Sequence, residues 1–154
     1  MANIITATIS ASAAAATVAP VTVADAHLAI GQQLLAGARV LAGGPNCAVT
    51  FAFVCAHASE CLLKAFLSWK GVTDKDLKAH HVRHDLVALR AMAVANGLAV
   101  DPTPPTWFAL LSDLHKSPFL LRYPVGLNCL VLPPTQPMLA DLELLEGLAR
   151  AARS

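Results

Sequence analysis

The segment from Asn46 to Gly71 constrains the fold most, because it is the longest uninterrupted helical pattern in the chain. At about 100° per residue, apolar side chains cover nearly the whole circumference of a helix over this segment. Its ionisable groups His57, Glu60 and Lys64 fall on one narrow face. A helix that is apolar nearly all round is normally enclosed by other helices. The segment therefore predicts the central helix of a helical protein.

The narrow polar face allows two interpretations. Glu60 and Lys64 are spaced i,i+4 and can form an ion pair across one helical turn, with His57 one turn before them. Alternatively, the three groups line a cleft and bind a ligand, since ionisable groups are seldom buried without a partner. The sequence leaves both interpretations open.

The other helical patterns are shorter and are separated by glycine and proline. We expect Asp25 and Asp85 to cap two of them, and Thr103 or Thr106 to cap another. The expected helices cover residues 25–42, 46–71, 85–96, 106–115 and 137–153, with a short helical turn over 73–79. This pattern predicts an all-α fold, an up-and-down bundle of about five antiparallel helices.

The chain divides into an N-terminal arm and one domain. Residues 25–154 hold all the expected helices and form the helical bundle domain. Residues 1–24 are rich in alanine and β-branched residues, and they are either an ordered arm that packs on a neighbouring subunit or a loose tail.

Composition limits the class of partner. Hydrophobic residues make up 56% of the chain and charged residues only 14%, which suggests that part of the surface faces another subunit in a homodimer. The net charge of +1 argues against duplex DNA and anionic membranes. Ionisable groups in the middle of the segment from Asn46 to Gly71 argue against a membrane span. The four cysteines form no C-x-x-C pair, so we expect a reducing cytoplasm and no metal site.

Two further groups could contact a ligand. His84 and Asp85 precede an expected helix, whose free N–H groups favour an anion, although a helix cap explains them equally simply. Arg122 and Tyr123 place a guanidinium beside an aromatic ring, a pair able to hold a phosphate and stack a base. Arg122 could instead tie down the following loop through carbonyl groups.

Three segments follow one another in an order that is typical of a known family. Residues 56–67 read AHASECLLKAFL, residues 84–89 read HDLVAL, and residues 121–124 read LRYP. They match a helix of the form small-x-x-(Ser/Ala)-Glu-x-x-Leu-Lys-Ala, a His-Asp-Leu helix start and a late Arg-Tyr-Pro. In this order they resemble the HEPN domain family, over about residues 25 to 150.

The resemblance implies an antiparallel helical bundle, usually dimeric, that binds nucleotides or RNA. Some members are the toxin partner of a small nucleotidyltransferase. Carried over residue by residue, the resemblance implies a ligand-binding site made of Glu60, Lys64, His84, Asp85, Arg122 and Tyr123.

Many members of that family are metal-independent endoribonucleases built on Arg-x(4–6)-His. This chain departs from the pattern, because none of its arginines is followed by a histidine at that spacing. After Arg122 the spacing reaches Leu127, Asn128 or Cys129. Cleavage without metal needs a general base to activate the 2′-hydroxyl, and Asn128 cannot titrate as a histidine does. We therefore expect no catalytic residue and no cofactor.

The leading interpretation is a non-catalytic HEPN-like domain, a cytoplasmic homodimer that binds a nucleotide or RNA near Lys64, His84 and Arg122. A toxin-antitoxin or nucleotidyltransferase partner would fit this interpretation. One alternative is a metal-independent endoribonuclease toxin that uses His57 or His84 as its base. Another is a purely structural dimerisation module in which Glu60 and Lys64 form an internal ion pair.

Overall fold

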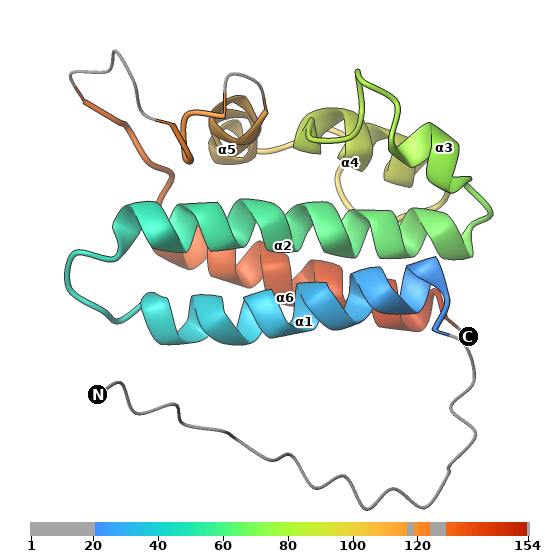
Figure 1. Cartoon of the computed structure of the whole chain (residues 1–154), viewed down its shortest axis with the longest axis horizontal. Coiled ribbons are helices and arrows are strands. Elements are labelled where there is room, and N and C mark those ends of the chain that lie inside the picture. The colour runs from blue at the N-terminus through green and yellow to red at the C-terminus, as the bar shows by residue number, and fades with distance from the viewer. Residues whose placement is uncertain (1–20, 117–118, 124–128, 154) are drawn as a thin grey trace, which may run out of the picture.

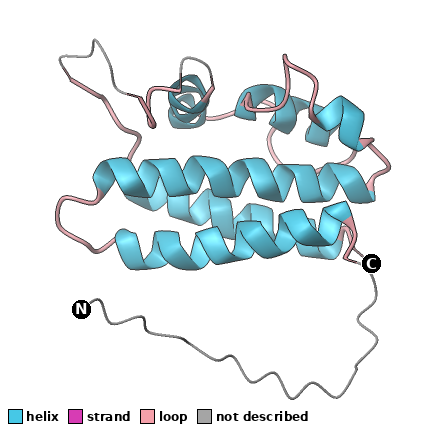
Figure 2. Cartoon of the chain, in the orientation of Figure 1, coloured by secondary structure: helices cyan, strands magenta, loops and turns pink. Residues whose placement is uncertain are grey.

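The computed structural model describes residues 21–116, 119–123 and 129–153, which form helices and no strand (Figures 1 and 2). Over these residues the chain is a helical bundle, so the predicted helical class is confirmed. Its six helices are α1 (Val23–Leu41), α2 (Ala48–Trp69), α3 (Asp74–Leu77), α4 (Leu86–Ala95), α5 (Thr106–His115) and α6 (Thr135–Ala151).

Helix α2 is the centre of the bundle. α1 and α6 lie along it, and α4 and α5 pack on a different side of it (Figure 1). Phe51, Leu62, Leu63 and Leu67 of α2 are almost completely buried, on more than one side of the helix. The prediction of a central, enclosed helix is confirmed, and the apolar circumference of α2 is explained by neighbours on several sides.

A glycine allows α1 to approach α2 closely. A Cβ atom on Gly31 would lie 2.7 Å from Cδ2 of Leu62, closer than two such atoms can pack. Since Leu62 is buried and cannot swing into solvent, the missing side chain of Gly31 sets the spacing of the two helices.

Three helices, α1, α3 and α4, begin after a residue whose side chain caps the helix. Asp85 caps α4, as predicted, and Thr73 caps α3. The prediction that Asp25 caps α1 is wrong: Thr22 is the N-cap, and its hydroxyl accepts a hydrogen bond from the N–H of Asp25. The hydroxyl of Thr22 also donates to the Asp25 carboxylate, so Asp25 stands at the third helical position, where the acidic residue of a capping box lies.

The helix α5 covers the expected residues 106–115, but the prediction that Thr103 or Thr106 caps it is wrong. Pro105 is the N-cap residue, and Thr106 is the first residue of the helix. The extended conformation of Pro105, at φ −62° and ψ 151°, ends the proline-rich connector and starts the helix without a side-chain cap. Residues 1–20, most of the predicted arm, lie outside the described residues, and α1 already begins at Val23.

One described helix, α2, is long and apolar enough to cross a membrane by length and composition. Most of it is buried inside the protein, however, and it carries the buried groups Glu60 and Lys64. Both observations are typical of the core helix of a soluble protein.

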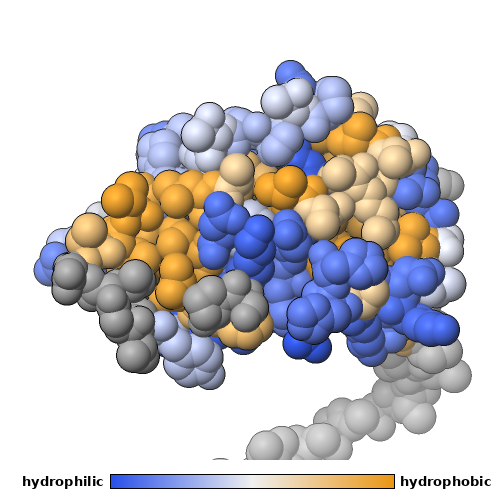
Figure 3. Space-filling view, turned by 90° about the horizontal axis from the view of Figure 1, so that it is seen from above, coloured by the Kyte–Doolittle hydropathy of each residue, from blue (hydrophilic) through white to orange (hydrophobic). Residues whose placement is uncertain are grey.

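The face formed by α3, α4 and α5 is divided between apolar and polar surface. Apolar side chains gather toward the end at which α2 begins, polar side chains occupy the middle, and the other end carries both apolar and polar areas (Figure 3). Val49, near the start of α2, has 45% of its surface exposed, which is high for a large apolar residue.

Candidate functional site

The site is built around the carboxylate of Glu60, which is buried in the middle of α2. Nζ of Lys64 lies 2.5 Å from Oε1 of Glu60, and both side chains are more than nine-tenths buried. The same ammonium group donates a hydrogen bond of 2.8 Å to the carbonyl oxygen of Arg83. The pair predicted from the i,i+4 spacing is therefore present, and it ties the segment before α4 to the central helix.

The second oxygen of Glu60 holds two histidines. Nε2 of His115 lies 2.7 Å from Oε2, and Nδ1 of His84 lies 3.1 Å from the same atom. Burial alone would raise the pKa of Glu60, but the hydrogen bonds from His115, Lys64 and His84 outweigh it and hold the pKa well below its ordinary value. Glu60 is thus a buried carboxylate that stays ionised.

Six side chains form a closed ring next to this carboxylate. Each is in contact with the next, in the order Phe53, His57, His115, His84, Phe119 and Arg122, and the last lies over the first. Ring centroids of successive aromatic members are 5.5 to 6.3 Å apart. The Arg122 guanidinium lies 5.5 Å from both the Phe53 and the Phe119 rings. We call this set the Arg122 ring.

The Arg122 ring joins three parts of the chain. Phe53 and His57 come from α2, and His84 comes from the turn just before α4. The other three members, His115, Phe119 and Arg122, come from the end of α5 and the turn that follows it. His115 is buried, while Arg122 is exposed and the other four members are half-buried. The ring therefore has a buried base next to Glu60 and an open, cationic rim.

Sequence reasoning missed Phe53, Phe119 and His115. The available signal for His115 was its place in α5, where it follows the apolar residues Leu111 and Leu114 and shares their buried side. A histidine on the apolar side of a short helix needs a buried partner, here Glu60. No comparable signal existed for Phe53 and Phe119, because aromatic residues are common in ordinary cores.

Asp85 serves as a helix cap. Its Oδ1 atom accepts a hydrogen bond of 3.0 Å from the N–H of Ala88 and one of 3.1 Å from the Ser112 hydroxyl. Nζ of Lys116 lies 3.4 Å from its other oxygen. Tyr123, also predicted as a ligand contact, has 63% of its surface exposed beside Arg122.

Stability is expected to fall in acid through Asp85. Burial opposes ionisation, but the Ala88 N–H, the Ser112 hydroxyl and Lys116 outweigh it and lower the pKa of Asp85 below 3.8. A lowered folded-state pKa stabilises the protein above the unfolded-state pKa, and this contribution is lost as pH falls through the folded-state value. Asp85→Ala should cost about 0.5–2 kcal/mol at pH 7 and less in acid, once the Asp85 carboxylate is protonated. Urea denaturation at several pH values measures the difference.

Asp85→Asn is the matched variant for this measurement. Its amide oxygen can still accept the hydrogen bond from Ala88, but it carries no charge. The variant should be less stable than the wild type at pH 7 and equal to it once Asp85 is protonated. A constant difference between wild type and Asp85→Asn over the whole pH range would contradict the assignment.

His57 differs from the other two histidines of the site. Its Nδ1 atom is buried and has no hydrogen-bond partner among the described residues. Burial lowers its pKa, and the attraction of Glu60 only partly compensates. His57 is thus neutral at physiological pH, with an available nitrogen lone pair. Burial raises the pKa of nearby Cys61 to about 11, which argues against a cysteine nucleophile.

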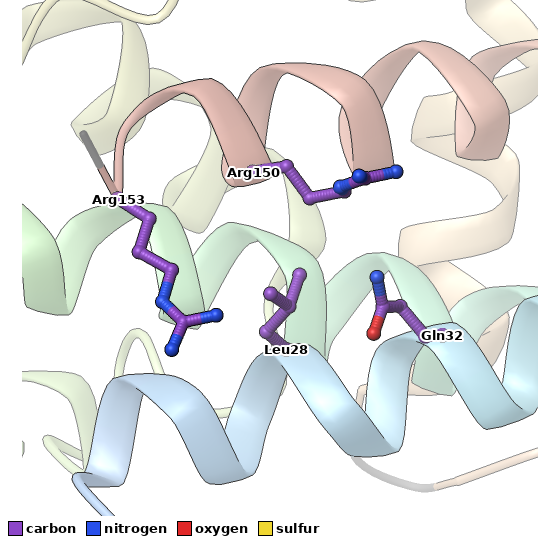
Figure 4. Close-up of a pocket in the computed structure, with 4 residues that line it drawn as sticks. All are labelled: Leu28, Gln32, Arg150 and Arg153. Carbon is purple, nitrogen blue, oxygen red and sulfur yellow. The ribbon is translucent and has the colours of Figure 1, made fainter.

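A separate hollow of about 680 Å³ lies between α1 and α6 (Figure 4). Leu28, Gln32, Arg150 and Arg153 line it. Each arginine already has an acidic partner, since Arg153 lies 3.2 Å from Asp25 and Arg150 lies 3.6 Å from Glu146. With its positive charge balanced, this open hollow is a weaker candidate than the Arg122 ring.

Comparison of the chain with protein-family models, with curated proteins and with solved structures finds no match.

Proposed function

We propose that the chain is a HEPN-like domain, a cytoplasmic homodimer of antiparallel helices that binds a nucleotide, free or within single-stranded RNA, without cleaving it. One observation carries the proposal. The three segments on which the resemblance rests meet at one place, since Glu60 and Lys64 bond to His84 and Arg83, and His84 is linked through Phe119 to Arg122.

The exposed rim of the Arg122 ring has the chemistry that nucleotides require. A guanidinium binds a phosphate through parallel hydrogen bonds, and aromatic faces stack on bases. Arg122 supplies the first, and the half-buried rings of Phe53 and Phe119 supply the second, with exposed Tyr123 beside them. Neutral stacking surfaces beside one cation suit a nucleotide better than an acidic peptide.

Glu60, Lys64 and Asp85 have a different role in this proposal from the one their motif implied. All three are engaged by neighbouring groups of the protein, and the charges of Glu60 and Lys64 balance each other. We assign them to positioning His84 and the start of α4, and we assign ligand contact to Arg122, Tyr123, His84 and the two phenylalanines.

The proposed homodimer is supported by the low share of charged residues and by exposed apolar side chains such as Val49 and Val131. A nucleotidyltransferase partner, as in a toxin-antitoxin pair, follows from the resemblance. The second candidate function is a purely structural dimerisation module, and the closed Glu60 and Lys64 pair is the observation that favours it.

Arg122→Met is expected to weaken nucleotide binding about ten- to hundredfold, because it removes charge-assisted hydrogen bonds to phosphate. Calorimetry with ATP and GTP and fluorescence anisotropy with a labelled short RNA measure the affinities. Arg39→Met is the matched control. Arg39 is an exposed arginine bonded to Glu143 on the α1 and α6 side, so its loss should leave binding unchanged.

The outcomes separate the candidates. Binding of RNA but not of ATP or GTP assigns the site to RNA, and the reverse assigns it to a mononucleotide. No binding of any ligand at millimolar concentration contradicts the proposal and leaves the structural module. RNA that is shortened on a gel after incubation would contradict a non-catalytic role and favour the endoribonuclease.

A further inference from the structure

Two histidines and a carboxylate meet at the base of the Arg122 ring in an arrangement that the nucleotide site does not require. His57 and Glu60 come from α2, and His115 comes from the last turn of α5. One donor atom of each lies within 4.8 Å of the donor atoms of the other two. The cluster combines residues that are far apart in the sequence.

The spacing of these atoms is close to that of a metal site. Ligands about 2.1 Å from a tetrahedral ion lie about 3.4 Å from one another. The donor atoms of His115 and Glu60 are 2.7 Å apart, which is closer than this, and no two of the three donor atoms are more than 4.8 Å apart. Small rotations of the side chains would therefore place all three around one ion.

The donor atoms also suit metal binding. Metal ligands must be a neutral imidazole or an ionised carboxylate. Nδ1 of His57 is buried and unpaired among the described residues, and Nε2 of His115 would exchange its hydrogen bond to Glu60 for a bond to the ion. A buried nitrogen without a partner is rare in folded proteins, and a bound ion would explain it.

Hydrogen bonds from neighbouring side chains also fix the orientation of the Glu60 carboxylate. Lys64 bonds to Oε1, whereas His115 bonds to Oε2, so one oxygen can bind an ion while the other keeps its hydrogen bond. Such outer contacts orient the ligands of metal sites. The ammonium charge lowers the affinity for a cation, and His84, which also bonds to Oε2, would have to rotate away or become a fourth ligand.

We propose that His57, Glu60 and His115 bind a divalent transition-metal ion, for which Zn²⁺ is the best fit. Two imidazoles and one carboxylate are typical zinc ligands, and three protein ligands leave a position for water or an anionic group. Arg122 takes no part in this site, so the metal site does not need the arginine on which nucleotide binding rests, although His84 lies beside both sites.

Cobalt provides the direct test. Co²⁺ occupies zinc sites and absorbs visible light strongly in a four-coordinate site but weakly when hydrated. The full-length protein, stripped with EDTA, should bind one Co²⁺ per chain with strong visible absorption, and Zn²⁺ should displace it. His57→Gln should weaken binding at least about tenfold, since it removes one of three ligands. It should still fold, because the described residues give Nδ1 of His57 no hydrogen bond to lose.

His80→Gln and His81→Gln are the matched controls, because these two neighbouring histidines are exposed and lie outside the cluster. Both should bind Co²⁺ as the wild type does, and Arg122→Met should too, even if nucleotide binding fails. Circular dichroism checks that each variant is folded. Equal binding by wild type and His57→Gln, or no four-coordinate spectrum at all, overturns the proposal.

Discussion

Replacing Lys64 with methionine is expected to cost about 3–5 kcal/mol of folding free energy, the usual cost of removing one partner from a buried ion pair. The variant leaves the Glu60 carboxylate buried without its nearest cation, and it leaves the Arg83 carbonyl without the ammonium donor. A methionine fills the same volume, so the loss measures charge and hydrogen bonding rather than packing. Chemical denaturation gives the difference in unfolding free energy.

A second substitution tests whether the charge of Glu60 causes the loss. In the double variant Glu60→Gln/Lys64→Met, the neutral amide needs no counter-ion but can still accept hydrogen bonds from His84 and His115. At least half of the stability lost in Lys64→Met should return. Equal instability of the single and double variants would show that Lys64 acts mainly through the Arg83 carbonyl.

The sequence was sufficient to predict this ion pair, because both partners lie on one helix. An i,i+4 spacing brings Glu60 and Lys64 together whatever surrounds them, once the segment is helical. The apolar circumference of the same segment predicted burial. A pair on a single element needs no knowledge of how the other elements pack.

The Arg122 ring could not be predicted in the same way, because its members come from different elements. His115 reaches Glu60 only when the end of α5 lies over the middle of α2, and Phe119 reaches His84 only through the turn that follows. These placements depend on tertiary packing, which local periodicity does not encode. His84 and Arg122 were singled out by their residue type and position and again by the family resemblance, whereas Phe53 and Phe119 were not.

The errors at helix starts have a local cause. An acid near the first turn of a helix serves either as the N-cap or as the third helical residue of a capping box. Asp85 is the cap itself, whereas Asp25 reaches back to Thr22. Both patterns satisfy free N–H groups, and the sequence around Asp25 offers both.

Substitutions of Phe51 and Phe53 can distinguish a residue that stabilises the fold from one that binds the ligand, because both are phenylalanines on the same helix. Phe51 has 1% of its surface exposed and belongs to the core, while Phe53 is half-buried under Arg122. Phe51→Ala should cost about 3–5 kcal/mol of folding free energy. Phe53→Ala should cost less than half as much, because part of its ring is already in water.

For ligand affinity the order should be reversed, with a larger loss in Phe53→Ala than in Phe51→Ala. Base stacking on an aromatic ring contributes about 1–3 kcal/mol, so Phe53→Ala should weaken nucleotide or RNA binding about five- to hundredfold. Phe51→Ala should bind as the wild type does at a temperature where it remains folded, since its ring faces the core. If both variants kept full affinity, base stacking on Phe53 would be excluded. If affinity fell only in proportion to stability, the aromatic members of the Arg122 ring would be part of the core, and the structural module would be the better account of this protein.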